Sequence, residues 1–266
     1  MEVLPEFSCT GKVAIVTGGG RGIGRSIALG LAEAGADVVV TGRTMGKLAE
    51  ITKEITGMGR RGFSVLTDIS VPEQVESLVS QTIAEMGKID ILVCNAGAIL
   101  HKPVVPLPGA TSFKNDAPIS NDEWYTIMNT NLSGTFFCIR AVGPYMIKQN
   151  YGKIIIISSV LAIRGGSYIV PYAASKGGLN ALVKSLSHEW ARHKINVNAI
   201  APGLTATEMA QGELEDKTLT EKNLRLIPLR RVAQPREIAL ATVYLASPAS
   251  DYMTGQVLSL DGGSSA

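Results

Sequence analysis

The sequence predicts an α/β fold, in which helices cover both faces of a parallel sheet. Short apolar runs alternate with amphipathic segments along the chain, which is the pattern of strands joined by crossover helices. The runs are apolar throughout rather than alternating, as expected for strands buried on both faces. Strands joined in this way run parallel, with right-handed crossovers. The pattern therefore indicates a doubly wound sheet of about seven strands.

The first part of the chain alternates strand and helix without interruption. Gly35 ends the first helix as a glycine C-terminal cap, and Pro72 starts the third, because proline is tolerated in a first helical turn. The expected strands span residues 12–17, 37–41, 62–67 and 89–94. The expected helices span residues 26–34, 44–58 and 72–87.

Residues 98–120 interrupt this alternation. Several prolines there exclude a regular helix or a central strand, so we expect a long surface loop. A helix then begins at Asn121, which we expect to cap it, and runs toward Gln149. The remaining strands are expected at 152–158, 195–200 and 256–260, and the remaining helices at 172–191 and 235–246. We interpret the mixed polar segment 203–227 as a mobile lid over a site.

The composition of the chain is typical of some classes of protein and argues against others. All 266 residues fit a single domain without repeats or linkers, and 45% hydrophobic with 18% charged residues is typical of a globular chain. A net charge of +2 argues against a nucleic-acid binder. The cysteines, Cys9, Cys94 and Cys138, form no C-x-x-C pair, which predicts reduced thiols and no metal site. Because no run could span a bilayer, we expect a cytoplasmic protein without a membrane partner.

A glycine cluster follows the first strand and opens the first helix. Its spacing is Gly18-x-x-x-Gly22-x-Gly24. A strand, a glycine turn and a helix N-terminus together bind phosphate, since glycine permits close backbone approach and the helix end supplies free N–H groups. The spacing differs from the general G-x-G-x-x-G fingerprint, and a merely tight strand–helix turn is the alternative.

The end of the second strand bears on the choice of cofactor. It carries Arg43 and lacks the carboxylate that accepts the ribose 2′-hydroxyl in NAD proteins. Arg43 could pair with a 2′-phosphate instead, assisted by Arg21, because guanidinium binds phosphate bidentately. We expect NADP(H) to be preferred, with NAD(H) possible. Solvated surface charge is the alternative for both arginines, and is our interpretation of Lys47, Arg60 and Arg61.

Tyr172 and Lys176 stand four positions apart on a predicted helix, so they share one face. A nearby ammonium favours an ionised phenol and lowers its pKa from about 10, which would let it exchange a proton with an alcohol or ketone. Ser159 ends the fifth strand, where open α/β sheets hold ligands, and could bind the same oxygen. We prefer it to Ser158, which points to the opposite side. A surface tyrosine beside a solvated lysine is the alternative.

Together these motifs resemble the short-chain dehydrogenase/reductase family over nearly the whole chain. The family's T-G-x-x-x-G-x-G motif matches residues 17–24, and its N-N-A-G motif matches residues 94–97, with Cys94 replacing the first asparagine. Its P-G after the sixth strand matches residues 202–203, and its Ser–Tyr–Lys set matches the three candidates named above. The resemblance implies a Rossmann-type sheet with strand order 3-2-1-4-5-6-7.

The resemblance also implies hydride transfer between a nicotinamide and a secondary alcohol or carbonyl. Tyr172 would be the general acid/base, Lys176 would hold the nicotinamide ribose, and Ser159 would position the substrate oxygen. Asn131 would support a water in a proton relay, with a local bond inside its helix as the alternative. Asp68 would contact adenine. The implied cofactor-binding residues are Gly18, Arg21, Gly22, Ile23, Gly24, Arg43, Asp68, Ile69, Asn95, Ala96, Gly97, Tyr172, Lys176, Pro202, Gly203 and Thr207.

The substrate class follows from finer resemblances. Residues 171–178 and 188–191 look more like those of sugar-acid and polyol dehydrogenases. Residues 165–171 lack the glutamine-rich loop of 3-oxoacyl carrier-protein reductases. We therefore expect a small polar hydroxy or keto compound, with a 3-oxoacyl thioester as the alternative. His101, Arg164 and Tyr168 are candidate substrate contacts.

Family resemblance implies a homotetramer as well. The helices that carry Tyr172 and Asn131 would form one interface, and the C-terminal strand region another. Two other classes of protein remain as alternatives, a non-catalytic nucleotide-binding regulator and a methyltransferase. Neither would need the serine, tyrosine and lysine together.

Overall fold

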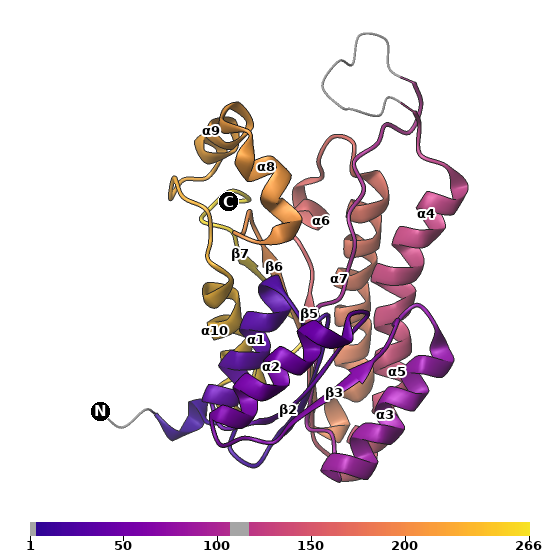
Figure 1. Cartoon of the computed structure of the whole chain (residues 1–266), viewed down its shortest axis with the longest axis vertical. Coiled ribbons are helices and arrows are strands. Elements are labelled where there is room, and N and C mark those ends of the chain that lie inside the picture. The colour runs from indigo at the N-terminus through magenta and orange to yellow at the C-terminus, as the bar shows by residue number, and fades with distance from the viewer. Residues whose placement is uncertain (1–3, 107–116) are drawn as a thin grey trace.

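The computed structural model describes residues 4–106 and 117–266. Seven parallel strands form one sheet in the order β3-β2-β1-β4-β5-β6-β7, which confirms the predicted fold class and strand order (Figure 1). The strands are β1 (Val13–Thr17), β2 (Asp37–Gly42), β3 (Gly62–Leu66), β4 (Ile91–Cys94), β5 (Gly152–Ile157), β6 (Ile195–Pro202) and β7 (Val257–Leu260).

Helices cover both faces of the sheet, and each face has its own apolar core (Figure 1). One face carries α1 (Gly22–Glu33), α2 (Met45–Gly57) and α10 (Pro235–Ala246). The other carries α3 (Pro72–Met86), α5 (Gly134–Gln149) and α7 (Val170–Trp190). Neighbouring residues of a strand enter opposite cores, since Ile15 packs in one and Val16 in the other. This explains why the strand sequences are apolar throughout.

One predicted helix start and one predicted helix cap are wrong. The helix α1 begins at Gly22 rather than Ser26, so the glycine turn itself forms the first helical turn. The helix α4 (Asn121–Met128) is capped by Ser120 and not by Asn121. The Ser120 hydroxyl accepts from the Glu123 N–H at 3.2 Å, and the Glu123 carboxylate accepts from the Ser120 N–H at 2.9 Å. These reciprocal bonds make a capping box, which satisfies two N–H groups at once.

The helix expected to run to Gln149 is interrupted. A π-helical turn, Asn129–Ser133, separates α4 from α5. Such turns are rare and are frequent at functional sites. Gly134 follows directly and packs tightly, since a Cβ there would lie 2.9 Å from Ile69. The turn therefore brings this helix against the segment that follows β3.

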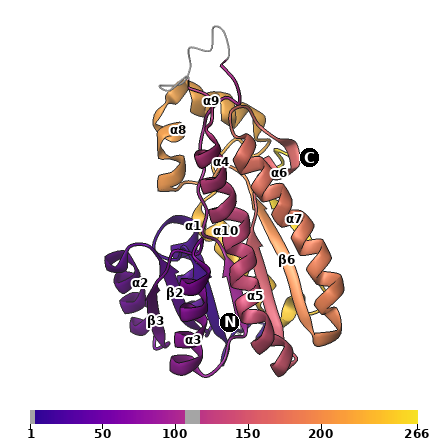
Figure 2. The ribbon, with the colours of Figure 1, turned by 90° about the vertical axis from the view of Figure 1, so that its right-hand side faces the viewer.

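The segment predicted as a lid is mostly helical. It contains a 3₁₀ turn (Glu208–Ala210), α8 (Gln211–Glu215) and α9 (Lys217–Leu226), which lie beyond the carboxyl ends of the strands (Figures 1 and 2). The Asp216 side chain caps α9 by accepting from the Leu219 N–H at 3.0 Å. Its mobility stays a prediction.

The other irregular segment follows β4. The described parts of residues 98–120 contain neither helix nor strand, and residues 107–116 of the expected loop lie outside the described residues. The Lys102 N–H donates to the Tyr168 carbonyl at 2.8 Å, which joins this segment to the loop before α7. None of the helices described is both long and apolar enough to cross a membrane.

Candidate active site

A pocket of about 440 Å³ opens at the carboxyl ends of β1, β2, β4, β5 and β6. The strand order reverses between β1 and β4, and ligands of open α/β sheets bind at this switch point. Every cofactor-binding candidate from the sequence lines this pocket, as do three of the four catalytic candidates; Asn131 does not. The lining candidates are Gly18, Arg21, Gly22, Ile23, Gly24, Arg43, Asp68, Ile69, Asn95, Ala96, Gly97, Ser159, Tyr172, Lys176, Pro202, Gly203 and Thr207.

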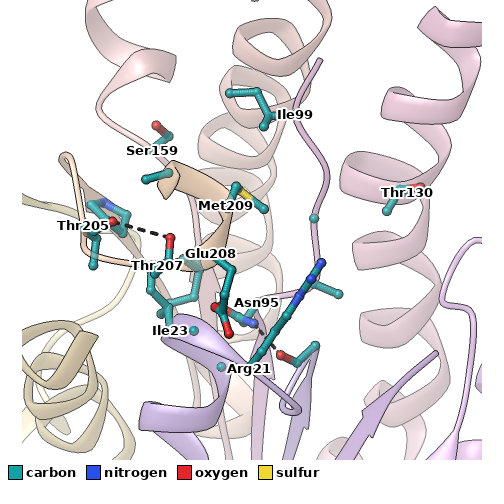
Figure 3. Close-up of a pocket in the computed structure, with 18 of the residues that line it drawn as sticks. Arg21, Ile23, Asn95, Ile99, Thr130, Ser159, Thr205, Thr207, Glu208 and Met209 are labelled. Carbon is teal, nitrogen blue, oxygen red and sulfur yellow. Dashed lines mark hydrogen bonds between the residues drawn. The ribbon is translucent and has the colours of Figure 1, made fainter. Parts of the chain in front are cut away.

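The glycine turn is packed so closely that side chains are excluded. Gly18 has φ +65°, and a Cβ there would lie 2.9 Å from the Ala96 Cα. A Cβ on Gly24 would lie 2.2 Å from the Gly18 carbonyl oxygen. The Asn95 amide donates to the carbonyls of Thr17 and Gly18 at 3.0 and 3.2 Å (Figure 3). The turn is thus fixed against the end of β4, with its backbone bare enough for a phosphate to approach.

Thr17 contributes through its hydroxyl, a role the motif alone did not reveal. Its Oγ1 accepts from the N–H groups of Asn95 and Ala96 at 3.0 and 3.1 Å. The hydroxyl also donates to the Val93 carbonyl at 3.3 Å. Together with the Asn95 amide, Thr17 therefore ties the carboxyl ends of β1 and β4 together at the floor of the pocket.

Positive charge gathers where β2 ends. Arg21, Arg43 and Lys47 line the pocket there. Lys47 is exposed, as its interpretation as a solvated surface charge requires, but it also faces the pocket. Because α2 begins at Met45, Lys47 falls in its first turn, with its Cβ 3.3 Å from where a Gly20 Cβ would be. This end of the pocket can hold a phosphate by several charge-assisted bonds.

Asp68 lies at the same end of the pocket. Its carboxylate accepts from the Ser70 hydroxyl at 2.7 Å and from the Ser70 N–H at 3.0 Å. These bonds, with the nearby charge of Arg43, lower the pKa of Asp68 against the opposing effect of burial. The carboxylate is therefore a fixed acceptor.

Ser159, Tyr172 and Lys176 meet on the opposite side of the pocket, from β5 and α7. Lys176 is buried, its Nζ donates to the Ile157 carbonyl at 2.6 Å, and it lies 5.7 Å from the centre of the Tyr172 ring. Burial lowers the pKa of Lys176 to about 8. The three side chains therefore lie together in the pocket that the glycine turn also lines.

The expected direction of the tyrosine shift is wrong in this structure. Burial raises the pKa of the Tyr172 phenol, while the hydrogen bond with the Ser159 side chain lowers it by less. The Lys176 ammonium is directed at a backbone carbonyl and does not offset the loss of hydration.

The two serines at the end of β5 have different partners. The Ser158 hydroxyl donates to the Asn180 side chain at 2.6 Å. The Ser159 hydroxyl accepts from the Leu161 N–H at 3.1 Å, at the start of a one-turn helix, α6 (Leu161–Arg164), which the sequence did not predict. Both serines line the pocket, but the Ser159 side chain is the one that bonds with Tyr172, which is consistent with the choice of Ser159 as the substrate-facing hydroxyl. Figure 3 shows Ser159 at the pocket wall.

Asn131 is fully buried beneath the pocket. Its Oδ1 accepts from the Ala98 N–H at 2.8 Å, and its Nδ2 donates to the Ala98 carbonyl at 2.9 Å and to the Ser175 hydroxyl at 3.0 Å. Both amide hydrogens are therefore engaged. The side chain fastens the segment after β4 to α7, and its part in a proton relay stays a prediction.

The lid contributes a carboxylate that no sequence motif predicted. The Glu208 Oε2 lies 3.4 Å from the position that a Cβ on Gly22 would occupy, directly over the glycine turn (Figure 3). Thr207, one of the cofactor-binding residues that the resemblance implies, lies beside it and donates to the Thr205 carbonyl at 3.4 Å. Glu208 thus sits where a phosphate would enter.

With this geometry described, comparison with known proteins decides the family. A family model described as enoyl-(acyl carrier protein) reductase matches residues 18–265. The chain belongs to the short-chain dehydrogenase/reductase family. As predicted, the protein is an NAD(P)-dependent oxidoreductase that acts on CH–OH groups.

Individual members of the family match almost end to end. A 2-dehydro-3-deoxy-D-gluconate 5-dehydrogenase of Escherichia coli (strain K12) is 38% identical over 262 residues, 98% of each chain. The crystal structure of a gluconate 5-dehydrogenase from Burkholderia cenocepacia J2315, in complex with NADP and tartrate, has TM-score 0.89 at 36% identity, covering 97% of each chain. A 3-oxoacyl-[acyl-carrier-protein] reductase of Staphylococcus epidermidis is 34% identical over 253 residues, 95% of this chain and 98% of its own.

Proposed function

We propose that this short-chain dehydrogenase/reductase interconverts a secondary hydroxyl and a ketone on a small sugar acid, with NADP(H) as its cofactor. The observation that carries the proposal is the meeting of Ser159, Tyr172 and Lys176 in one pocket with a glycine turn in which Gly18 and Gly24 have no room for a Cβ. The sugar-acid relatives named above support this substrate class.

The chain's residues have separate tasks in this reaction. A bound nicotinamide supplies or accepts the hydride. The Tyr172 phenol gives a proton to the substrate oxygen in reduction and takes one in oxidation. The Ser159 hydroxyl holds that oxygen in place, and Lys176 adds positive charge beneath the phenol. Removing water from the pocket strengthens each of these interactions.

The cationic end of the pocket supports NADP(H) over NAD(H). Arg21, Arg43 and Lys47 offer a 2′-phosphate several donors, and the described carboxylates lining the pocket are Asp68 and Glu208. Asp68 is engaged by Ser70. NAD(H) remains usable, because the glycine turn binds the phosphates that both cofactors share.

A substrate panel tests the proposal. Absorbance of the reduced nicotinamide is followed with sugar acids, polyols, diketones and 3-oxoacyl thioesters, each with both cofactors. We expect turnover of a hydroxy or keto sugar acid, faster with the 2′-phosphorylated cofactor. Turnover confined to 3-oxoacyl thioesters would favour the reductase alternative, which the Staphylococcus relative supports. Cofactor binding without any turnover would favour a regulator.

We also propose that the protein is a cytoplasmic homotetramer. Exposed apolar side chains on α5, including Phe136, Tyr145 and Ile147, and others near β7, including Leu240 and Tyr252, support two self-association surfaces. Sedimentation of the purified chain tests this, and a monomer at micromolar concentration would contradict it.

A further inference from the structure

One cation of the pocket has no task in holding the cofactor or exchanging the proton. Arg164 lines the pocket at the end that carries Ser159 and Tyr172, whereas Arg21 and Arg43 lie by the glycine turn and the end of β2. Lys176 is buried and bonded to a carbonyl. Of the ion pairs among the described residues, none includes Arg164.

The helix α6 couples Arg164 to the reacting centre. The Ala162 N–H donates to the Ser159 carbonyl at 3.0 Å, and the Arg164 N–H donates to the Val160 carbonyl at 3.0 Å. Arg164 therefore stands five residues beyond Ser159, about 7.5 Å along the axis at a helical rise of ~1.5 Å per residue. In a hexonic acid, four carbon–carbon bonds of about 1.5 Å each separate the carboxylate carbon from the 5-position, which is a span of the same order.

Among the described residues, the opposite wall of this end adds no competing negative charge. The bond from the Lys102 N–H to the Tyr168 carbonyl holds the His101 segment beside the loop that follows Arg164, and His101 lines the pocket. The Lys102 ammonium forms an ion pair with Glu123, with 2.5 Å between Nζ and Oε1. Both lining carboxylates of the described chain, Asp68 and Glu208, lie at the cofactor end.

We propose that Arg164 binds the carboxylate of the substrate and thereby selects hydroxy acids over neutral polyols. This rests on the proposed function and adds the group that recognises the acid. A guanidinium pairs with a carboxylate by two parallel N–H···O bonds, which fixes the direction of the carbon chain as well as its charge. With the acid held at α6, the distal hydroxyl reaches Ser159 and Tyr172.

The test compares two substrates that differ only in this group. D-gluconate and D-glucitol share a carbon chain, with a carboxylate in one and a CH₂OH in the other. For Arg164→Gln we expect the ratio of kcat/KM for gluconate to that for glucitol to fall about 10- to 100-fold, mainly through KM, the loss typical of a charge-assisted pair. Arg164→Lys should restore part of it, since lysine keeps the charge without the fork.

Control variants distinguish a failure of the role assigned to Arg164 from a failure of the proposed function. Arg192→Gln removes an exposed arginine bonded to His193, outside the pocket, and should leave the ratio unchanged. Unchanged NADPH affinity in Arg164→Gln shows that the variant is folded. If the wild type prefers hydroxy acids and Arg164→Gln keeps the same preference, this inference is overturned but the proposed function stands. A wild type that turns over no hydroxy acid overturns the proposed function, and the inference with it.

Discussion

Arg43 follows the end of β2, at the position that we propose decides between the two nicotinamide cofactors. It lines the pocket with Arg21 and Lys47, and its charge reaches Asp68. For Arg43→Asp we predict that the Kd for NADPH rises about 10- to 100-fold, because a carboxylate replaces the partner of the 2′-phosphate. The Kd for NADH should change far less. Fluorescence titration with both cofactors measures the difference.

The matched control for Arg43 is Lys53→Asp on the same side of the sheet. Lys53 is exposed on α2 and does not line the pocket, so neither cofactor should bind differently. An equal loss of affinity for NADPH and NADH in Arg43→Asp would mean that this arginine is structural.

Lys176 makes stability depend on pH in a defined window. Burial lowers its pKa from 10.5 to about 8, so between these values the unfolded chain binds more protons than the folded one. The cost of burying the charge is therefore complete below pH 8 and disappears as the pH rises toward 10.5. We predict that Lys176→Met has a higher free energy of unfolding than the wild type at pH 7, by up to about 3 kcal/mol.

Urea unfolding of the cofactor-free protein between pH 7 and 10 measures this difference. The advantage of Lys176→Met should shrink steadily across the window. Lys184→Met, at an exposed position of the same helix, should show no such trend. A difference that stays constant with pH would mean that packing, and not charge, separates the variants.

At single residues, the sequence predicted the site residues that motif spacing identifies. It missed those whose place in the pocket depends on the direction of the side chain. The interval between Tyr172 and Lys176 places both on one helical face, and the glycine spacing marks the turn. Lys47 was missed as a lining residue although the helix expected at 44–58 already places it in the first turn, because the direction of its side chain depends on packing against the glycine turn. Glu208 needed the path of the lid over Gly22, and a carboxylate there runs against the charge expected at a phosphate site.

Among the elements, the lid segment places its carboxylate over the glycine turn, which we propose binds the cofactor phosphates. Glu208 lies next to Gly22, so a bound pyrophosphate and this carboxylate repel each other unless the segment shifts. We predict that Glu208→Gln lowers the Kd for NADPH several-fold, and that the gain diminishes at high salt. Titration with NADPH at two ionic strengths measures this change in Kd.

The control is Glu215→Gln, at an exposed position of α8 outside this pocket. Weaker binding in Glu208→Gln would mean that the side chain instead helps to hold the cofactor.

Element types followed from the sequence, but several boundaries did not. Glycine is a poor helix former, which is why α1 was expected to begin after Gly24. The tertiary contact of Gly24 with the Gly18 carbonyl overrides that preference. The π-helical turn before Gly134 depends on how closely that glycine packs on Ile69, which no local pattern encodes.

At the scale of the molecule, topology explains why the site lies where it does. The reversal of strand order between β1 and β4 leaves a crevice, into which β5 and α7 bring the serine, tyrosine and lysine. Fold class, strand order and the pocket's main residues were accessible from the sequence, because a buried parallel sheet needs continuous apolar strands. The pKa of Tyr172 was not, since its direction depends on how deeply the phenol is buried.

The measurement that tests this account most directly is the turnover of Tyr172→Phe with a sugar acid, alongside its affinity for NADPH. Removing one hydroxyl leaves the ring beside Lys176 and takes away the only exchangeable proton of that side chain. We predict a fall in kcat of about 1,000-fold or more, in line with loss of an acid/base group, and an NADPH Kd within about two-fold of the wild type. Tyr125→Phe, at an exposed position, should match the wild type in both. Turnover retained by Tyr172→Phe would contradict the account.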